Sequence, residues 1–331
     1  MKDPIRVRNN LLKNRVVIKL KYLNVGAMYN IKKFLLFLLF ILISPMLAFS
    51  SDLLTIFKKL PHSEFGVKAN NETIDNLAKI VTDPKLSATG KSYLTVNRMG
   101  FDVLNTAESI NSWVVTEFLE FIKGTKKPVL DIGAGYGHIS LTALAQGNKV
   151  VANDIALEHL LNIRKFALNK HLSVGQLYLN INSFPSEMNF PNNSFDAIML
   201  HRVIHFMSPQ QIIEGFAKIS KWLAPGGKVF IVVMSPQHKQ FADWFLPIYE
   251  QKWQQGDKWP GVNLPVKKAL PDQVYNLPKV LHVMDDRPLR LAFEKLGFDI
   301  EKSEFISMRH FATKPNERDG KEAMGIVAIK K

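Results

Sequence analysis

The sequence predicts a doubly wound α/β fold, in which helices cover both faces of a mostly parallel sheet. Two stretches indicate it. Residues 129–154 read as a strand, a glycine turn, a helix and a second strand, which is the repeating unit of parallel sheets. Residues 197–233 repeat the order strand, helix, strand. The 331 residues are 47% hydrophobic, which is enough for one elaborated α/β domain.

The first of these stretches also carries the most specific chemistry. Three glycines at alternate positions follow the apolar run of residues 129–132, namely Gly133, Gly135 and Gly137. Glycines let a ligand approach the backbone, and the helix expected over residues 138–146 offers unpaired N–H groups. Asp154 follows the second strand, residues 149–153, where a carboxylate can bind a ribose diol. We therefore expect an adenosine ligand at this turn.

Spacing and charge indicate which adenosine ligand. A dinucleotide turn places its third glycine five residues after the first, whereas Gly137 follows Gly133 by four. Asp131 puts negative charge where a pyrophosphate would lie, and it suits a cationic amino acid group instead. Both features favour a sulfonium cofactor. The stretch resembles the first motif of the class I S-adenosylmethionine-dependent methyltransferases, which reads hydrophobic pair, Asp, hydrophobic, G-x-G-x-G.

Later segments extend the resemblance over most of the chain after about residue 68. They are the "NSFD" turn at residues 193–196, the "L-x-P-G-G" at residues 223–227, and a closing helix and strand pair at residues 289–296, 298–308 and 323–329. The resemblance implies a Rossmann-like, seven-stranded, mostly parallel sheet whose last strand is antiparallel. It also implies transfer of a methyl group to oxygen, nitrogen or carbon of an acceptor. We expect a small-molecule acceptor, and a protein or a lipid stays open as the alternative.

The resemblance assigns the cofactor-binding residues for S-adenosyl-L-methionine. Asp131 and the glycines Gly133, Gly135 and Gly137 would hold the amino acid end, and Asp154 the ribose. After the third strand, at about residues 177–181, the family often has an acid that meets the adenine amino group. This chain has Asn182 there, whose side-chain oxygen also accepts such a bond.

Catalysis needs mainly alignment of the acceptor with the methyl group, plus a base where the acceptor carries a proton. His201, near the end of the fourth strand, is our candidate for this catalytic role, and a capping or packing role stays equally open. For His205 packing is favoured. Arg202 suits an acidic substrate, although a structural ion pair is the commoner role. We expect no metal site, because no third ligand stands near the two histidines and the chain has no cysteine.

Two segments outside the sheet are expected to shape the substrate site. An insertion at about residues 235–287 is rich in aromatics, which are Phe241, Trp244, Phe245, Tyr249, Trp253, Trp259 and Tyr275. It is either a cap over the site or an added packing layer. Residues 51–126 form a helical N-terminal extension with a possible second cap element around Tyr93 to Phe101. The methyltransferase domain itself is expected over residues 127–331.

The first fifty residues have the composition of a targeting segment. Nine Lys or Arg and one acid precede Phe34, and residues 34–50 carry no charge. The pattern is that of a signal peptide, with a membrane anchor through Phe34 to Phe49 as the alternative, so the protein is expected to be exported or membrane-anchored. Residues 1–27 also suggest a start placed too early, because Met28 begins a natural signal.

Charge excludes one class of partner. The net charge is +14, but +8 of it precedes Phe34, so the remaining +6 gives no dense basic stripe and nucleic acid is not expected. Two other functions stay open. One is a noncatalytic binding protein on a methyltransferase scaffold, which the intact motif disfavours. The other is a nicotinamide-dependent oxidoreductase, which the glycine spacing disfavours.

Overall fold

The computed structural model describes residues 52–103, 112–309 and 319–331. The chain divides into two units, residues 1–59 and 60–331. In the first unit, residues 52–58 form a helix. The predictions of a signal peptide, a membrane anchor and a late start fall on residues 1–50, which lie outside the described residues. Within the described ranges, no helix combines the length and the apolar character needed to span a membrane.

The second unit is built on a nine-stranded sheet with the order β1-β2-β7-β6-β5-β8-β9-β13-β12. The strands are β1 (His62–Ser63), β2 (Gly66–Lys68), β5 (Val129–Ile132), β6 (Val150–Asn153), β7 (Leu177–Asn180), β8 (Phe195–His201), β9 (Leu223–Met234), β12 (Phe298–Ile306) and β13 (Ala323–Lys330). Strands β7, β6, β5, β8 and β9 are parallel, and β13 runs antiparallel to both of its neighbours. This is the predicted arrangement with a reversed last strand.

The strand count differs from the seven expected. The hairpin β1–β2 lies in the extension predicted to be helical, and it adds to the edge of the sheet through antiparallel pairing of Val67 with Leu179 and Lys68 with Tyr178. Strands of two and three residues leave no periodic pattern in a sequence, so only the pairing with β7 reveals them. The extension also contains the expected helices, α2 (Glu72–Ile80) and α4 (Trp113–Phe121).

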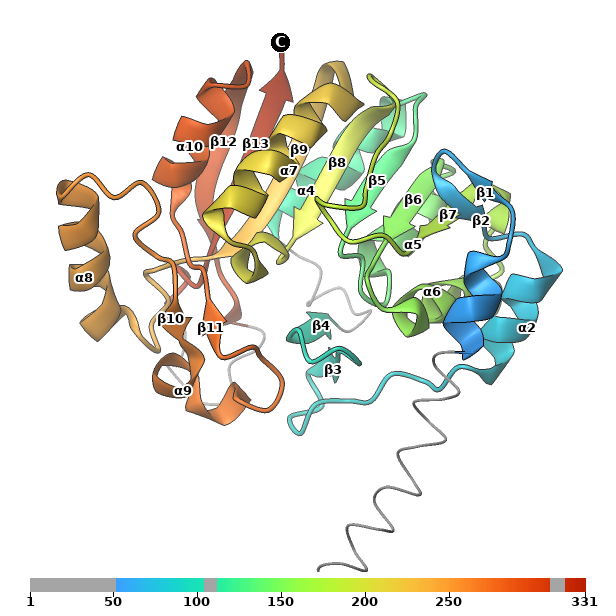
Figure 1. The fold of residues 1–331 in the computed structure, drawn as a ribbon, viewed down its shortest axis with the longest axis horizontal. Coiled ribbons are helices and arrows are strands. Elements are labelled where there is room, and N and C mark those ends of the chain that lie inside the picture. The colour runs from blue at the N-terminus through green and yellow to red at the C-terminus, as the bar shows by residue number, and fades with distance from the viewer. Residues whose placement is uncertain (1–51, 104–111, 310–318) are drawn as a thin grey trace, which may run out of the picture. The chain divides into compact units, whose positions relative to one another are not determined.

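Helices cover both faces of the sheet, as the sequence predicts (Figure 1). On one face, α7 (Pro209–Trp222) and α10 (Asp286–Glu294) share a core with Leu130, Ile198 and Ile231. On the other face, α4 packs against β9, where the rings of Phe118 and Phe230 are 5.2 Å apart. Successive strand residues point to opposite faces, so strands covered on both sides are mostly apolar, with Asp131 on β5 and Asn153 on β6 as buried polar exceptions.

The start of α7 is encoded locally. Ser208 caps the helix by accepting the N–H of Gln211, the side chain of Gln211 accepts the N–H of Ser208, and Pro209 occupies the first turn. This capping box satisfies N–H groups that no helical carbonyl can reach. The helix therefore begins at Ser208-Pro209, as predicted. Because β8 precedes it, the helix start is fixed close to the carboxyl end of that strand.

Two small hairpins lie beyond the end of the sheet at which the parallel strands finish (Figure 1). The first is β3 (Ser92–Leu94) with β4 (Phe101–Val103), from the N-terminal extension. The second is β10 (Leu264–Pro265) with β11 (Val280–Leu281), from the insertion, which also contains α8 (Ala242–Gln254) and α9 (Val266–Ala269). The insertion has a hydrophobic core of its own, whose aromatic members are Phe241, Phe245 and Tyr249. It therefore adds a packed layer.

Candidate functional site

A cavity of about 250 Å³ lies at the carboxyl ends of β5, β6 and β8. In parallel α/β sheets this is the edge at which ligands bind. The sheet and its following turns contribute Ile132, Gly133, Gly135, Asn153, Asp154, Ile155, Ser183, Phe184, His201, Arg202 and Val203. The hairpin β3–β4 contributes Thr95, Asn97, Met99, Phe101 and Asp102, and the segment before and within α7 contributes Phe206, Met207 and Gln211.

The glycine turn donates its backbone N–H groups to the protein itself. Gly135 N–H donates to Oδ2 of Asp154 at 2.9 Å. Tyr136 N–H donates to Oδ2 of Asp102, on hairpin β3–β4, at 2.5 Å. The N–H groups of Ala134 and Gly137 donate to backbone carbonyls at 2.7 and 2.8 Å. A pyrophosphate needs such N–H groups and repels carboxylates. The turn therefore opposes a dinucleotide, in agreement with the glycine spacing.

Asp154 is the most firmly positioned of the predicted cofactor-binding residues. It follows β6, is buried, and lines the cavity. Besides the N–H of Gly135, its carboxylate accepts the N–H of Ala156 at 2.9 Å and bonds to Nδ1 of His159 at 3.0 Å. A carboxylate has about four acceptor positions, so three donors leave room for a hydroxyl. This fits the predicted contact with a ribose, which stays a prediction.

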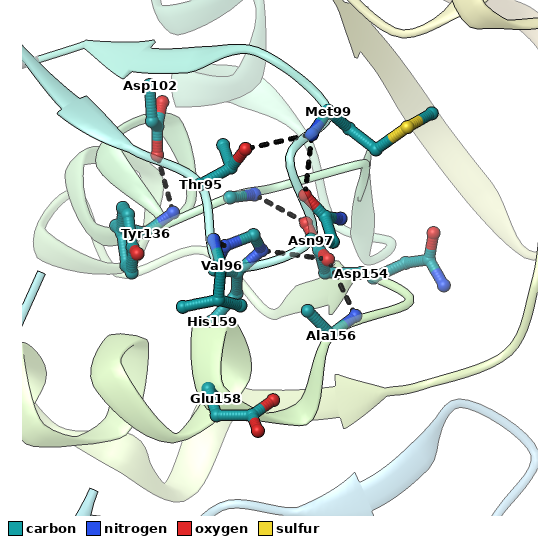
Figure 2. A network of polar contacts seen from close by, with 12 residues as sticks. Thr95, Val96, Asn97, Met99, Asp102, Tyr136, Asp154, Ala156, Glu158 and His159 are labelled. Carbon is teal, nitrogen blue, oxygen red and sulfur yellow. Dashed lines mark hydrogen bonds and ion pairs between the residues drawn. The ribbon is translucent and has the colours of Figure 1, made fainter. Parts of the chain in front are cut away.

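His159, on α6 (Leu157–Asn169), joins the site to hairpin β3–β4 (Figure 2). The N–H of Val96 donates to its Nε2 at 3.2 Å, so Nδ1 carries the proton that is donated to Asp154. Burial lowers the pKa of His159, but the hydrogen bond and the negative charge of Asp154 outweigh burial, and the pKa is raised overall. No sequence motif points to His159, because its partner Val96 lies 63 positions away in the chain.

Asp131 lies beneath the glycine turn rather than at the cavity. Its side chain is buried, and Oδ2 accepts the hydroxyl of Ser140 at 2.7 Å. Burial raises its pKa to about 7 against the opposing effect of the Ser140 bond, and the charges of Asp102 and Asp154 raise it further. Asp131 is not among the residues that line the cavity. Its predicted contact with the amino acid end of the cofactor remains untested.

The three glycines have different surroundings. Gly133 and Gly135 line the cavity, as their predicted role requires. Gly137, with a φ of +77°, begins α5 (His138–Ala145), and a Cβ there would lie 2.5 Å from Cγ1 of Ile163. The residue that leaves no room for a Cβ at Gly137 is thus Ile163 of α6. Its role in cofactor binding stays a prediction.

Asn182 stands beside the cavity. Its N–H donates to Oδ1 of Asn180 at 3.1 Å, and its carbonyl accepts Nδ2 of Asn153 at 2.7 Å. Its neighbours Ser183 and Phe184 line the cavity, and Asn182 is absent from the lining. The adenine contact predicted for Asn182 is not tested, and Ser183 is the nearest polar alternative.

His201 and Arg202 both reach the cavity from the end of β8. Arg202 has a φ of +64°, and its N–H donates to the carbonyl of Val232 at 2.8 Å. Such a backbone is uncommon for a residue with a Cβ and is often found at functional sites. His205 lies in a short 3-10 helix, is fully buried, and burial lowers its pKa to about 3. It does not line the cavity, so the packing role favoured for it fits this position.

Hairpin β3–β4 covers the glycine turn, where the sequence suggested a second cap element. The hydroxyl of Tyr136 donates to the carbonyl of Leu94 at 2.9 Å, and the rings of Tyr93 and Tyr136 are 5.6 Å apart. The Thr95 hydroxyl accepts the N–H of Met99 at 3.1 Å, which shapes the connection between the two strands. Figure 2 shows this hairpin lying against Tyr136 and His159.

The insertion meets the residues around this cavity in two places, at the hairpin and at the segment before α7, where Phe206 packs against the core of the insertion and Nδ1 of His282 lies 3.0 Å from the carbonyl oxygen of Met207. Among the described residues, none of the insertion's aromatic side chains lines the cavity. Instead, the carbonyl of Asn276 accepts the N–H of Gly100 at 2.7 Å, and Leu277 lies beside the same glycine. The aromatic lining comes from Phe101, Phe184 and Phe206.

Comparison with known proteins gives a consistent result. Residues 129–227 match the sequence model of a family described as "Methyltransferase domain". The chain is 28% identical over 116 residues to phosphoethanolamine N-methyltransferase 3 of Arabidopsis thaliana, covering 35% of this chain and 23% of that protein. It is 29% identical over 129 residues to the ubiquinone biosynthesis O-methyltransferase of Xanthomonas axonopodis pv. citri (strain 306), covering 38% of this chain and 52% of that protein. The chain thus spans about a quarter to half the length of these relatives.

A solved structure supports the fold. A SAM-dependent methyltransferase from Methanosarcina mazei superposes with a TM-score of 0.50 at 17% identity, over 66% of this chain and 97% of that chain. At this identity the similarity concerns the fold alone.

Proposed function

We propose that this chain, which belongs to the class I S-adenosylmethionine-dependent methyltransferases through its domain at residues 129–227, transfers a methyl group to a small molecule. One observation carries the proposal. A single cavity brings together the glycine turn, the ribose-binding candidate Asp154 and a histidine at the end of β8. The methyltransferase motif is thus assembled around a space that can hold a ligand.

The chemistry that S-adenosyl-L-methionine supplies is a methyl group on a positively charged sulfur. The protein then contributes position and proton handling. Asp154 orients the ribose, and the glycine turn lets the cofactor lie against the backbone. His201 takes a proton from an acceptor that carries one. Apolar residues of the hairpin and of the segment before α7, such as Met99 and Phe206, exclude water from the acceptor.

The acceptor is proposed to be small because the cavity, which would have to hold both the cofactor and the acceptor, is about 250 Å³ and is bordered on one side by hairpin β3–β4. The two relatives named above are an N-methyltransferase and an O-methyltransferase, so similarity favours neither atom. We therefore assign the reaction to transfer onto oxygen, nitrogen or carbon.

Calorimetric titration of S-adenosylhomocysteine and of NAD tests the cofactor assignment. We expect S-adenosylhomocysteine to bind in the micromolar range and NAD not to bind. Asp154→Ala should lose binding, because it removes the carboxylate that would hold the ribose. Asp299→Ala, which removes an exposed carboxylate on β12, is the control and should bind as the wild type does. A folded wild-type protein that does not bind S-adenosylhomocysteine would refute the proposed enzyme.

A further inference from the structure

We propose that a second cavity, formed by α7, α10 and the insertion, binds a fatty acid, which combines an apolar chain with one carboxylate. The cavity measures about 230 Å³ and shares no lining residue with the cavity at the glycine turn. A ligand there would occupy a separate site. Binding of a fatty acid is therefore independent of the proposed function.

Apolar side chains from three segments form the walls of this second cavity. Helices α7 and α10 lie on the same face of the sheet, and the rings of Phe216 and Phe293 stack between them with 4.4 Å between their centroids (Figure 1). The insertion closes the cavity with the segment that follows α8. The apolar lining residues are Ile213, Ala217, Trp259, Pro288, Leu291, Ala292 and Leu296.

Helical spacing places these side chains in two stripes. On α7, Ile213 and Ala217 are four positions apart, and on α10, Leu291 and Ala292 follow Pro288 by three and four. Residues at such spacings lie on one face of a helix. Ile213 is 46% exposed, which is unusual for a large apolar side chain in a cavity wall. An apolar ligand that covers this surface removes it from water and is stabilised by doing so.

Trp259 of the insertion is held in place by its neighbours. Its ring packs edge-on against the imidazole of His282, with 5.4 Å between the centroids. Its backbone N–H donates to Oδ1 of Asp257 at 2.9 Å. An aromatic ring fixed in this way offers a large apolar surface and loses little conformational entropy when a ligand binds.

Two lysines give the cavity a positive charge. Lys258 and Lys295 belong to its lining, both side chains are exposed, and no acidic residue lines the cavity with them. Within the parts of the chain that the structure describes, neither lysine forms an ion pair. A lysine can lay its alkyl stem along an apolar wall while its ammonium group stays in water. The two ammonium groups would therefore meet the head group of a ligand whose chain fills the cavity.

The combination of apolar walls and positive charge selects one kind of ligand. A cationic head group would be repelled by both lysines, and a neutral one would gain nothing from them. A carboxylate is attracted by both. Ligand cavities commonly have such mostly apolar walls, with a few charged groups that fix the orientation. The small volume suits one alkyl chain of medium length.

Quenching of tryptophan fluorescence tests whether a fatty acid enters this cavity. We would titrate the full-length protein with 8-bromooctanoate, whose bromine quenches a tryptophan that it contacts. The wild type should show saturable quenching. Trp259→Phe keeps an apolar ring but should lose that quenching, because it removes the reporter at the cavity. Trp244→Phe, which changes a tryptophan of the insertion outside the cavity, is the control and should keep it.

Competition with unlabelled ligands tests the two parts of the fatty acid separately. Each buried methylene should strengthen binding by about fourfold, so hexanoate should compete at least about tenfold more weakly than octanoate. Octylammonium has the same chain with the opposite charge and should not compete. Competition by octylammonium as strong as that by octanoate would overturn the assignment of an anionic ligand.

Variants of the lining test the role of the lysines. The double variant Lys258→Gln, Lys295→Gln should raise the Kd of octanoate by at least about fivefold and leave that of octanol within about twofold. The matched control is Lys79→Gln, Lys123→Gln, which removes the same charge from two exposed lysines outside the cavity and should leave both affinities unchanged. Ala217→Phe should fill the cavity and abolish saturable quenching.

Several results would contradict a fatty acid site. They are quenching that persists in Trp259→Phe or in Ala217→Phe, equal weakening by the two lysine double variants, and octanol binding as tightly as octanoate. The lysine variants change exposed side chains only, so they decide the matter even if Ala217→Phe does not fold. All of these variants should bind S-adenosylhomocysteine as the wild type does, because they lie outside the first cavity. A failure here therefore leaves the proposed function standing.

Discussion

Replacing Asp131 with asparagine should stabilise the protein at neutral and alkaline pH. In the folded protein, burial raises the pKa of Asp131 from 3.8 to about 7, despite the hydrogen bond from Ser140. The folded state therefore holds a proton that the unfolded chain has released over this range. Stability from this group is fully present below pH 3.8 and is lost as the pH rises through about 7. Asparagine has the same shape, accepts the Ser140 hydroxyl and does not titrate.

The magnitude follows from the two pKa values. Each pKa unit corresponds to about 1.4 kcal/mol, so the whole difference amounts to roughly 4 kcal/mol. Between pH 5 and pH 8, the wild type should lose roughly 2 to 3 kcal/mol of the free energy of unfolding through the titration of Asp131. The free energy of unfolding of Asp131→Asn, relative to the wild type, should therefore increase by that amount over this interval. Desolvation is the main cause, since the side chain is 3% exposed.

Urea denaturation of both proteins at pH 5, 6, 7 and 8 measures this difference. The other titrating groups are common to both proteins, so they cancel in the comparison. Asp299→Asn, at an exposed position on β12, is the control for loss of one charge and should show no such trend. If the difference between Asp131→Asn and the wild type stayed constant within about 0.5 kcal/mol, Asp131 would not be a buried acid that titrates near neutrality.

Two further variants test the site. His201→Ala should lower turnover by about 100- to 10,000-fold with little change in S-adenosylhomocysteine affinity, because a base acts on the acceptor. Equal losses of turnover and of S-adenosylhomocysteine affinity would show that His201 is not the base. Gly135→Ala should lower the free energy of unfolding by more than about 1 kcal/mol and weaken cofactor binding, because its Cβ would meet Asp102. Gly226→Ala, at a φ of +76° in open space, measures the backbone strain alone. Equal destabilisation by the two glycine variants, read from urea denaturation, would contradict a steric contact at Asp102.

The elements that the sequence specified well are those with local signals. The strand at residues 129–132, the helix after Gly137 and the capped start of α7 all depend on residues within a few positions of one another. The hairpin β1–β2 and the exact strand count could not be predicted in this way. Their two or three residues carry no periodicity, and they exist because β7 offers an edge to pair with.

The same distinction, between local sequence signals and distant contacts, applies to the residues of the candidate site. By itself, the sequence determined the doubly wound fold, the type of cofactor and the identity of the glycine turn, because motif spacing is a local property. It also placed Asp154 and His201 at strand ends, where a cavity forms. Only the tertiary structure decided that Asp131 is buried, that Asp102 meets Tyr136 across 34 positions, and that Val96 bonds to His159 across 63. Such contacts depend on how a short hairpin packs against distant segments, and no periodic pattern in a chain records that packing.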